Sequence, residues 1–202
     1  PAGRRVSAPR SIVVAGTGIF GVTAALELRR RGYAVTLTDP GPLPHPDAAS
    51  TDVSKAIRMD YGSDALYMEL MEEALAGWDA WNRRWPEPLY HEDGFLVMAA
   101  GPMRPGEFER ESFDLLVKRG HSPVRLDAAS LRARFPAWGT DRYRDGYLNP
   151  RAGWAESGKV VARLVAEARE AGVLLREGVR VARLLEAASR VVGVEIAPVV
   201  AA

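Results

Sequence analysis

A glycine-rich segment, Gly16-Thr17-Gly18-Ile19-Phe20-Gly21, constrains the fold of this chain more than any other feature. It follows a short apolar, β-branched run over residues 11–15, which is typical of a buried parallel strand. Apolar residues at helical spacing come next, over residues 19–31, and a second apolar run over residues 33–38 ends at Asp39. These segments predict a β-α-β unit of about thirty residues whose glycine-rich turn opens the helix.

Each glycine of this segment has a separate task in a dinucleotide-binding turn. Gly16 permits the sharp turn from strand to helix, Gly18 lets the backbone approach a pyrophosphate, and Gly21 lets the helix lie close to the sheet. The free amides at the start of the helix attract phosphate groups. Asp39 would accept hydrogen bonds from ribose hydroxyls and repel a 2′-phosphate, which disfavours NADP. The pattern predicts dinucleotide binding by Gly16, Thr17, Gly18, Ile19, Phe20, Gly21 and Asp39.

The rest of the chain predicts an insertion followed by a return to the sheet. A proline-rich loop over residues 40–46 leaves the second strand, and a helix is expected over residues 65–85. Asp93-Gly94, between two short strand signals, is a dipeptide typical of a hairpin. Further helices are predicted over 107–119, 128–135 and 157–171, and strands over 124–126, 146–148, 173–175, 179–186 and 191–196, the last two as a hairpin around Ser189.

This order of elements predicts an α/β fold. We expect a Rossmann-type nucleotide-binding domain made of two chain segments, with a partial α+β substrate domain inserted between them. The expected boundaries are a flexible leader over residues 1–10, a first nucleotide-binding segment over 11–88, the inserted domain over 89–148 and the second nucleotide-binding segment over 149–202.

Composition and charge argue against several classes of function. The net charge is +1 and the arginines are spread along the chain, so neither nucleic acid nor a membrane surface is expected as a partner. The chain has no cysteine, which excludes disulfides and thiolate chemistry and is compatible with the cytoplasm. No apolar run approaches the length of a membrane span. His45, His91 and His121 lack metal-ligand spacing, so no metal site is expected and each is interpreted as a surface or loop residue.

Two other segments carry a more specific pattern. The segment Ser50–Gly62 starts rich in serine and then places a basic residue, an arginine three positions later and a tyrosine-glycine pair. The segment Asn149–Gly158 leads into a helix, and Val179-Arg180-Val181 follows in a strand. In these features the chain resembles the amine-oxidising flavoenzymes of the D-amino-acid oxidase superfamily, most closely the monomeric sarcosine oxidase and fructosyl-amino-acid oxidase group, over residues 11–196.

The resemblance implies FAD as the cofactor, and oxidation of a secondary amine or N-substituted amino acid by hydride transfer to the flavin, with oxygen as the acceptor. It implies that Lys55 lies near the reactive edge of the flavin, where the sarcosine enzymes carry arginine, and that Arg58 holds a substrate carboxylate. Ser50 and Thr51 are expected to contact FAD, and the backbone of Val181 the adenine. The alternative interpretation is that Lys55 and Arg58 are surface charges on one face of a short helix.

Members of this superfamily are nearly twice as long as these 202 residues. Their second half normally completes the sheet and the flavin site, so we expect the chain to be incomplete by itself. An unfinished sheet would expose an edge and apolar surface, which predicts self-association or a second polypeptide. Two other functions stay open: a non-catalytic dinucleotide-binding subunit or fragment, and an NAD-dependent dehydrogenase, against which the proline-rich loop argues.

Overall fold

The computed structural model describes residues 10–138 and 140–199, so the predicted leader, apart from Arg10, lies outside the described residues. The chain forms two compact units, which we call the outer unit and the inserted unit. The outer unit contains the chain up to Ser54 and again from Glu156, and the inserted unit contains Lys55–Ala155. The chain passes from the outer to the inserted unit between Ser54 and Lys55 and returns between Ala155 and Glu156.

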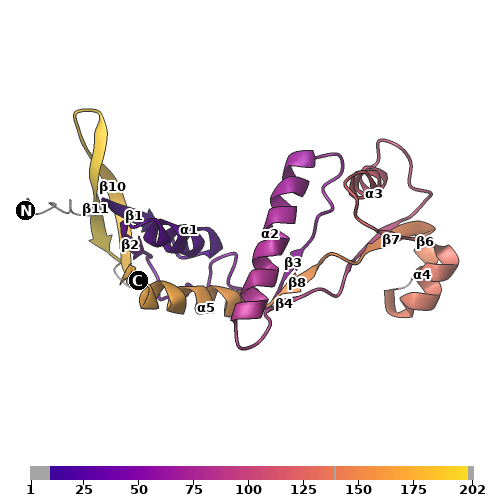
Figure 1. Cartoon of the computed structure of the whole chain (residues 1–202), viewed down its shortest axis with the longest axis horizontal. Helices are drawn as coiled ribbons and strands as arrows, with labels where there is room; N and C mark the ends of the chain where they lie inside the picture. Colours follow the sequence, from indigo (N-terminus) through magenta and orange to yellow (C-terminus); the bar gives the residue numbers. More distant parts are fainter. Residues whose placement is uncertain (1–9, 139, 200–202) are drawn as a thin grey trace, which may run out of the picture. The chain divides into compact units, whose positions relative to one another are not determined.

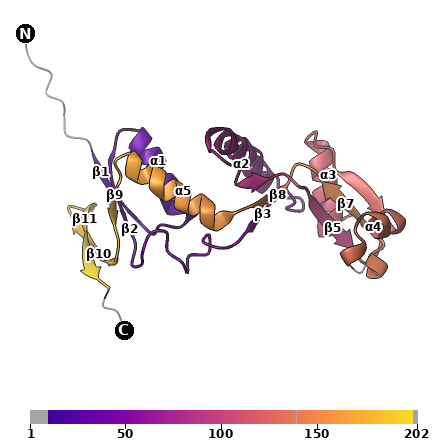
Figure 2. The ribbon, with the colours of Figure 1, turned by 90° about the horizontal axis from the view of Figure 1, so that it is seen from below.

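A three-stranded parallel sheet organises the outer unit. The strand order is β1-β2-β9, with Ala15 opposite Thr38 and Thr38 opposite Arg176. Helices α1 and α5 pack against each other beside this sheet (Figures 1 and 2). The elements are β1 (Ser11–Ala15), α1 (Ile19–Arg30), β2 (Ala34–Thr38), α5 (Ser157–Glu170), β9 (Leu174–Arg176), β10 (Val179–Ala187) and β11 (Arg190–Pro198). The predicted β-α-β unit is therefore confirmed.

The apolar stripes predicted for the two helices form the core of the outer unit. Helix α1 buries Val22 and Ala25, and strand β2 buries Val35 and Leu37. The five positions predicted for one side of α5 are all buried: Val160, Val161, Leu164, Val165 and Ala168. Burial of such a stripe stabilises a helix more than intrinsic propensity does.

Strand β1 departs from its prediction as a buried strand. Ser11, Val13 and Ala15 are exposed, and the Val13 side chain keeps 40% of its surface. Among the described residues β1 pairs with β2 alone, which makes it the edge of the sheet. Parallel strands are buried when both faces of their sheet are covered, and the described residues leave the face of Ser11, Val13 and Ala15 uncovered.

The last two strands form the predicted antiparallel hairpin. Strands β10 and β11 pair from Val179 opposite Pro198 to Ala187 opposite Arg190. The turn residues Ala188 and Ser189 have φ angles of 49° and 59°, the left-handed pair that matches the twist of a two-residue hairpin.

The inserted unit contains two small antiparallel sheets with the orders β3-β8-β4 and β5-β7-β6. Its core gathers Met59, Met68, Leu75, Leu116 and Tyr147 from four segments. The elements are β3 (Lys55–Ile57), α2 (Ala65–Arg84), β4 (Tyr90–His91), β5 (Phe95–Ala99), α3 (Phe108–Lys118), β6 (Val124–Asp127), α4 (Ala128–Arg134), the short 3-10 turns Pro136–Trp138 and Thr140–Arg142, β7 (Asp145–Asn149) and β8 (Gly153–Ala155).

The unit is wider than the domain expected over residues 89–148, because α2 supplies Met68 and Leu75 to its core. Its assignment as a substrate domain stays a prediction.

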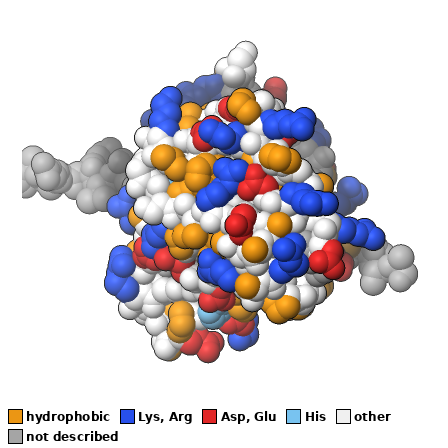
Figure 3. Space-filling model, turned by 90° about the vertical axis from the view of Figure 1, so that its right-hand side faces the viewer, with side chains coloured by type: hydrophobic (Ala, Val, Ile, Leu, Met, Phe, Trp, Pro, Cys, Tyr) orange, Lys and Arg blue, Asp and Glu red, His pale blue; other side chains and the backbone are white. Residues whose placement is uncertain are grey.

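In the view of Figure 3, basic and acidic side chains are interleaved over the surface rather than gathered in one basic block. None of the helices in residues 10–138 and 140–199 combines the length and apolarity needed to cross a membrane.

One prediction about strands in this unit is wrong, and two of its strands were not predicted. Asp93-Gly94 does not close a hairpin: β4 pairs with β8, whereas β5 pairs with β7. Gly94, with φ of 90°, donates its N–H to Ala152 O and makes a corner between the two sheets. A dipeptide that favours positive φ suits either kind of turn. Strands β3 and β8 were not predicted, because three residues are too few for a periodic signal.

Candidate functional site

The glycine-rich turn sits between the end of β1 and the start of α1. Gly16 has φ of 97° and donates its N–H to Thr38 O at 2.8 Å, which ties the turn to β2. A Cβ added to Gly21 would lie 1.8 Å from Gly16 O, so only glycine lets the first helical turn approach so closely. Gly18 is the N-cap and provides no side-chain cap for the helix amides. The turn therefore has the close backbone approach that the sequence predicted.

Ser50 reaches the start of α1 from a distant loop. Its Oγ accepts a hydrogen bond from the N–H of Ile19 at 3.0 Å, and a Cβ added to Gly18 would lie 3.3 Å from the same oxygen. The neighbouring Thr51 donates its N–H to Ala48 O at 2.7 Å, which fixes the loop locally. The structure thus brings Ser50, expected at the cofactor only from resemblance, onto the predicted phosphate-binding turn. Phe20, in the same turn, is 89% exposed.

Asp39 is almost fully buried at the end of β2, and most of its acceptor capacity is used. Its Oδ2 accepts from Thr17 N–H at 2.8 Å and from Thr17 Oγ1 at 2.7 Å, and its Oδ1 accepts from Gly41 N–H at 3.0 Å. Thr17 is itself fully buried. The hydroxyl of Thr17 therefore orients Asp39, and we expect it to act on a ligand through that carboxylate rather than by contact.

The start of β10 lies beside Asp39. The N–H of Asp39 donates to Arg176 O at 3.0 Å, and the N–H of Val179 donates to Asp39 O at 3.1 Å. Val181 follows two residues along the same strand and is partly buried. Asp39 and the strand of Val181 therefore meet at the carboxyl end of the sheet, where open α/β sheets bind their ligands.

His45 is a neighbour of Asp39 that sequence analysis treated as a loop residue. Its Nε2 lies 3.8 Å from Asp39 Oδ1, and its side chain is 25% exposed. The sequence feature that could have indicated this contact is the position of His45 in the loop that follows β2 and Asp39.

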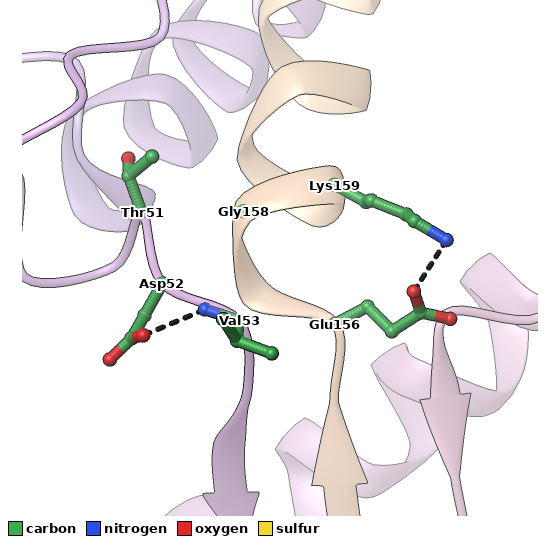
Figure 4. Close-up of a pocket in the computed structure, with 6 residues that line it drawn as sticks. All are labelled: Thr51, Asp52, Val53, Glu156, Gly158 and Lys159. Carbon is green, nitrogen blue, oxygen red and sulfur yellow. Dashed lines mark hydrogen bonds and ion pairs between the residues drawn. The ribbon is translucent and has the colours of Figure 1, made fainter.

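A cavity of about 520 Å³ lies in the outer unit between the Thr51–Val53 segment and the start of α5 (Figure 4). Gly158 N–H donates to Asp52 O at 2.8 Å and Ser157 Oγ donates to the same oxygen at 3.1 Å. Glu156 and Lys159 pair at the opposite rim. Thr51 Oγ1 is a buried atom with no hydrogen-bond partner within the described chain. Its hydroxyl therefore keeps capacity for a ligand.

Lys55 and Arg58 both lie in the inserted unit. Lys55 is the exposed first residue of β3, opposite Ala155. The short helix of the alternative interpretation is therefore wrong, although Lys55 does lie at the surface as that interpretation holds. Arg58 donates from Nη1 to Asp60 O, and its guanidinium lies 4.6 Å from the centre of the Tyr61 ring and 5.8 Å from that of Phe95. Aromatic faces stabilise such a cation. Because the hydrogen bond to Asp60 O uses only one N–H of the guanidinium, other N–H groups remain for a ligand.

A buried carboxylate next to Arg58 was not predicted. Asp60 is fully buried; its Oδ1 accepts from Tyr147 OH at 2.6 Å and its Oδ2 from Asn149 Nδ2 at 3.3 Å. Burial raises the pKa of Asp60, although both hydrogen bonds oppose this shift. Burial also raises the pKa of Tyr147 far above its ordinary value. Within the described ranges, no cluster of three or more His, Cys, Asp or Glu residues could hold a metal ion.

Comparisons with known proteins agree on one family. The sequence profile of the FAD dependent oxidoreductase family, DAO, matches residues 11–202. L-saccharopine oxidase of Schizosaccharomyces pombe is 30% identical over 81% of this chain and 39% of its own length. The peroxisomal sarcosine oxidase of Homo sapiens is 26% identical over 85% of this chain and 43% of its own length. The chain therefore spans about two fifths of these curated relatives.

A solved structure confirms the fold over nearly the whole chain. The L-proline dehydrogenase from P. horikoshii superposes with a TM-score of 0.79 over 93% of this chain and 49% of its own, at 20% identity. At that identity the likeness bears on the fold alone.

Proposed function

Because the chain belongs to the family of FAD-dependent oxidoreductases, with FAD as its cofactor, we propose that the outer unit binds the ADP moiety of FAD. The protein of which this site is part would oxidise a secondary amine or an N-substituted amino acid. FAD, when bound, supplies the hydride acceptor of that reaction. The observation that carries the proposal is the convergence of Gly18, Ser50 and Asp39 at the carboxyl end of the sheet.

The residues present fit this group. The N-cap Gly18 has no side chain to cover the amides at the start of α1, where Ser50 Oγ accepts from the Ile19 N–H alone among them, and this suits a pyrophosphate. Asp39 Oδ1 has a remaining lone pair for a ribose hydroxyl, and the backbone around Val181 is placed beside it for the adenine. Ser50 and Thr51 add hydroxyls near the same turn. We propose these residues, with Gly16, Ile19, Phe20 and Gly21, as the cofactor site.

The test titrates the chain with FAD, ADP, NAD and NADP and measures each affinity by calorimetry. We expect FAD and ADP to bind, and NADP to bind more weakly than NAD because Asp39 repels the 2′-phosphate. Binding of NAD in preference to FAD would overturn the proposal in favour of a dehydrogenase. If ADP binds fully but no flavin reduction is seen, even with a second polypeptide present, the result would favour a non-catalytic dinucleotide-binding subunit.

Residues 1–202 alone are expected to hold FAD weakly and to turn over no amine. Contacts to the flavin ring would come from elements beyond the two fifths that the relatives share with this chain, and the remaining contacts must still offset the immobilisation of the ligand. The measurement combines fluorescence titration of FAD, peroxide release with N-methyl amino acids, and sedimentation. Because β1 is an open edge of its sheet, we expect the chain to self-associate or to bind a second polypeptide there. A monomeric yellow chain with steady turnover would contradict this.

Lys55→Met is expected to slow flavin reduction or reoxidation by roughly 100-fold in an active holoenzyme, the effect of losing a charge near the reacting group. ADP binding should change little. Lys55→Arg retains the charge and should keep most of the rate, and Lys118→Met, on the exposed end of α3, is the matched control. Stopped-flow absorbance of both half-reactions is the measurement, and wild-type rates in both would remove Lys55 from the site.

Arg58→Ala is expected to weaken binding of a carboxylate-bearing substrate by about 1.5–3 kcal/mol, the size of a lost charged hydrogen bond. The amide of the same substrate should be unaffected, because it lacks the charge. Affinities for the acid and amide are compared in wild type, Arg58→Ala and Arg58→Lys. Equal affinity of the wild type for acid and amide would argue against this role.

A cytoplasmic location stays a prediction from the cysteine-free sequence.

A further inference from the structure

We propose that His45 is a second ribose-binding residue, whose Nε2–H binds a hydroxyl of the adenosine ribose beside Asp39 Oδ1. The inference rests on the proposed ADP site and adds a specificity-determining residue to it. It is carried by three observations: the limited capacity left on Asp39, the orientation of the imidazole, and the glycine that makes room for the ring.

Asp39 alone cannot satisfy both ribose hydroxyls. A carboxylate offers about two acceptor positions on each oxygen. Both positions of Oδ2 are taken by Thr17 N–H and Oγ1, and one position of Oδ1 is taken by Gly41 N–H. One position is left on Oδ1 for a ligand. A ribose with two neighbouring hydroxyls therefore calls for a second polar partner at this place.

His45 presents the complementary group. Its Nδ1 accepts a hydrogen bond from Asp47 N–H at 3.1 Å, so the neutral ring carries its proton on Nε2. Nε2 is the atom turned toward Asp39 Oδ1, at 3.8 Å. That separation is longer than a hydrogen bond, so neither atom is spent on the other. An N–H donor and a carboxylate acceptor thus lie side by side. The oxygen of one ribose hydroxyl can accept from the N–H while its O–H donates to the carboxylate.

Gly41 leaves room for the imidazole at this position. A Cβ on Gly41 would lie 2.5 Å from His45 Cδ2 and 2.7 Å from Nε2, so a larger residue would displace the ring. Gly41 O accepts from Gly178 N–H at 3.4 Å, and Asp39 O accepts from Val179 N–H. The imidazole, the carboxylate and the start of β10 therefore share one backbone frame, on the side where the adenine is expected.

The test measures ADP, 2′-deoxy-ADP and 3′-deoxy-ADP binding to the whole chain by calorimetry. We expect His45→Ala to weaken ADP binding about 3- to 10-fold, as for one lost hydrogen bond. One deoxy analogue should bind wild type correspondingly weakly and lose nothing further in His45→Ala, whereas the other should lose as much as ADP does. His45→Gln keeps an N–H donor and should recover part of the affinity. His91→Ala, in the inserted unit, is the matched control.

Imidazole NMR gives a second readout on the unmutated protein. The chain has three histidines, so their signals can be assigned by single substitutions. ADP should shift the Nε2 signal of His45 and leave those of His91 and His121 in place. Normal ADP binding by His45→Ala and an unmoved His45 signal would overturn the inference while the ADP site stands. Failure of wild type to bind ADP would overturn the site and the inference together.

Discussion

Gly18→Val is expected to lower the affinity of the chain for ADP and FAD by roughly 100-fold or more, equivalent to about 2.8 kcal/mol. A Cβ on Gly18 already lies 3.3 Å from Ser50 Oγ, which itself covers the N–H of Ile19. The two methyl groups of valine would extend into the space through which a pyrophosphate approaches the helix amides. Gly18 has an extended backbone, so valine adds no strain of its own there.

Three variants separate loss of binding from loss of folding. Gly77→Val, on α2 with open space around the added group, is the matched control and should bind ADP as wild type does. Gly18→Ala, with a single added carbon, should give an intermediate affinity. Gly21→Ala should instead destabilise the outer unit, because its Cβ would overlap Gly16 O. Calorimetry with ADP and circular dichroism are the measurements, and unchanged affinity in folded Gly18→Val would disprove the phosphate-binding role of this turn.

Asp60→Ala is expected to destabilise the inserted unit by about 2–5 kcal/mol. It removes the acceptor from both Tyr147 OH and Asn149 Nδ2, and a buried donor left without a partner costs about 1–3 kcal/mol. All five tryptophans, at positions 78, 81, 85, 138 and 154, lie in this unit, so their fluorescence in urea reports its unfolding. Asp114→Ala, which loses an exposed pair with Arg110, should cost less than about 1 kcal/mol. Equal losses in the two variants would show that the buried network stabilises nothing.

The pH dependence of Asp60 has a definite sign. Burial raises its pKa from the ordinary value of 3.8, so the folded unit holds this proton more tightly than the unfolded chain. The resulting stability is fully present below 3.8 and is lost as pH rises through the raised pKa. Asp60→Asn has no proton to lose, so wild type should lose stability relative to it over that window. A constant difference between them would contradict the shift.

Glu72 contributes to the pH dependence of stability with the opposite sign, so the contribution of Asp60 is measured as the difference between wild type and Asp60→Asn. Its hydrogen bond with Arg119 lowers the pKa of Glu72 to about 2, with a smaller contribution from His121. The stability from Glu72 is therefore present above its ordinary pKa of 4.5 and is lost as pH falls toward 2. Wild type and Asp60→Asn share this contribution, so their difference isolates Asp60.

Local patterns in the sequence were enough to predict several parts of this protein. The glycine-rich turn with its flanking strand and helix, the buried stripe of α5 and the β10–β11 hairpin all follow from residues close together in the chain. Spacing alone is enough there, because helix periodicity and turn conformation are local properties. The resemblance to flavin amine oxidases added the family and the cofactor, which the comparisons confirm.

Contacts between groups that are distant in the sequence follow from the folded chain and not from local patterns. Strand β3 exists because Lys55–Ile57 pairs with Gly153–Ala155, almost a hundred positions away, and Asp93-Gly94 became a corner because its two strands found different partners. The allocation of the oxygens of Asp39 and the approach of His45 likewise depend on how loops are held. Such contacts depend on three-dimensional packing and backbone hydrogen bonding between remote segments, which leave no periodic trace in the sequence.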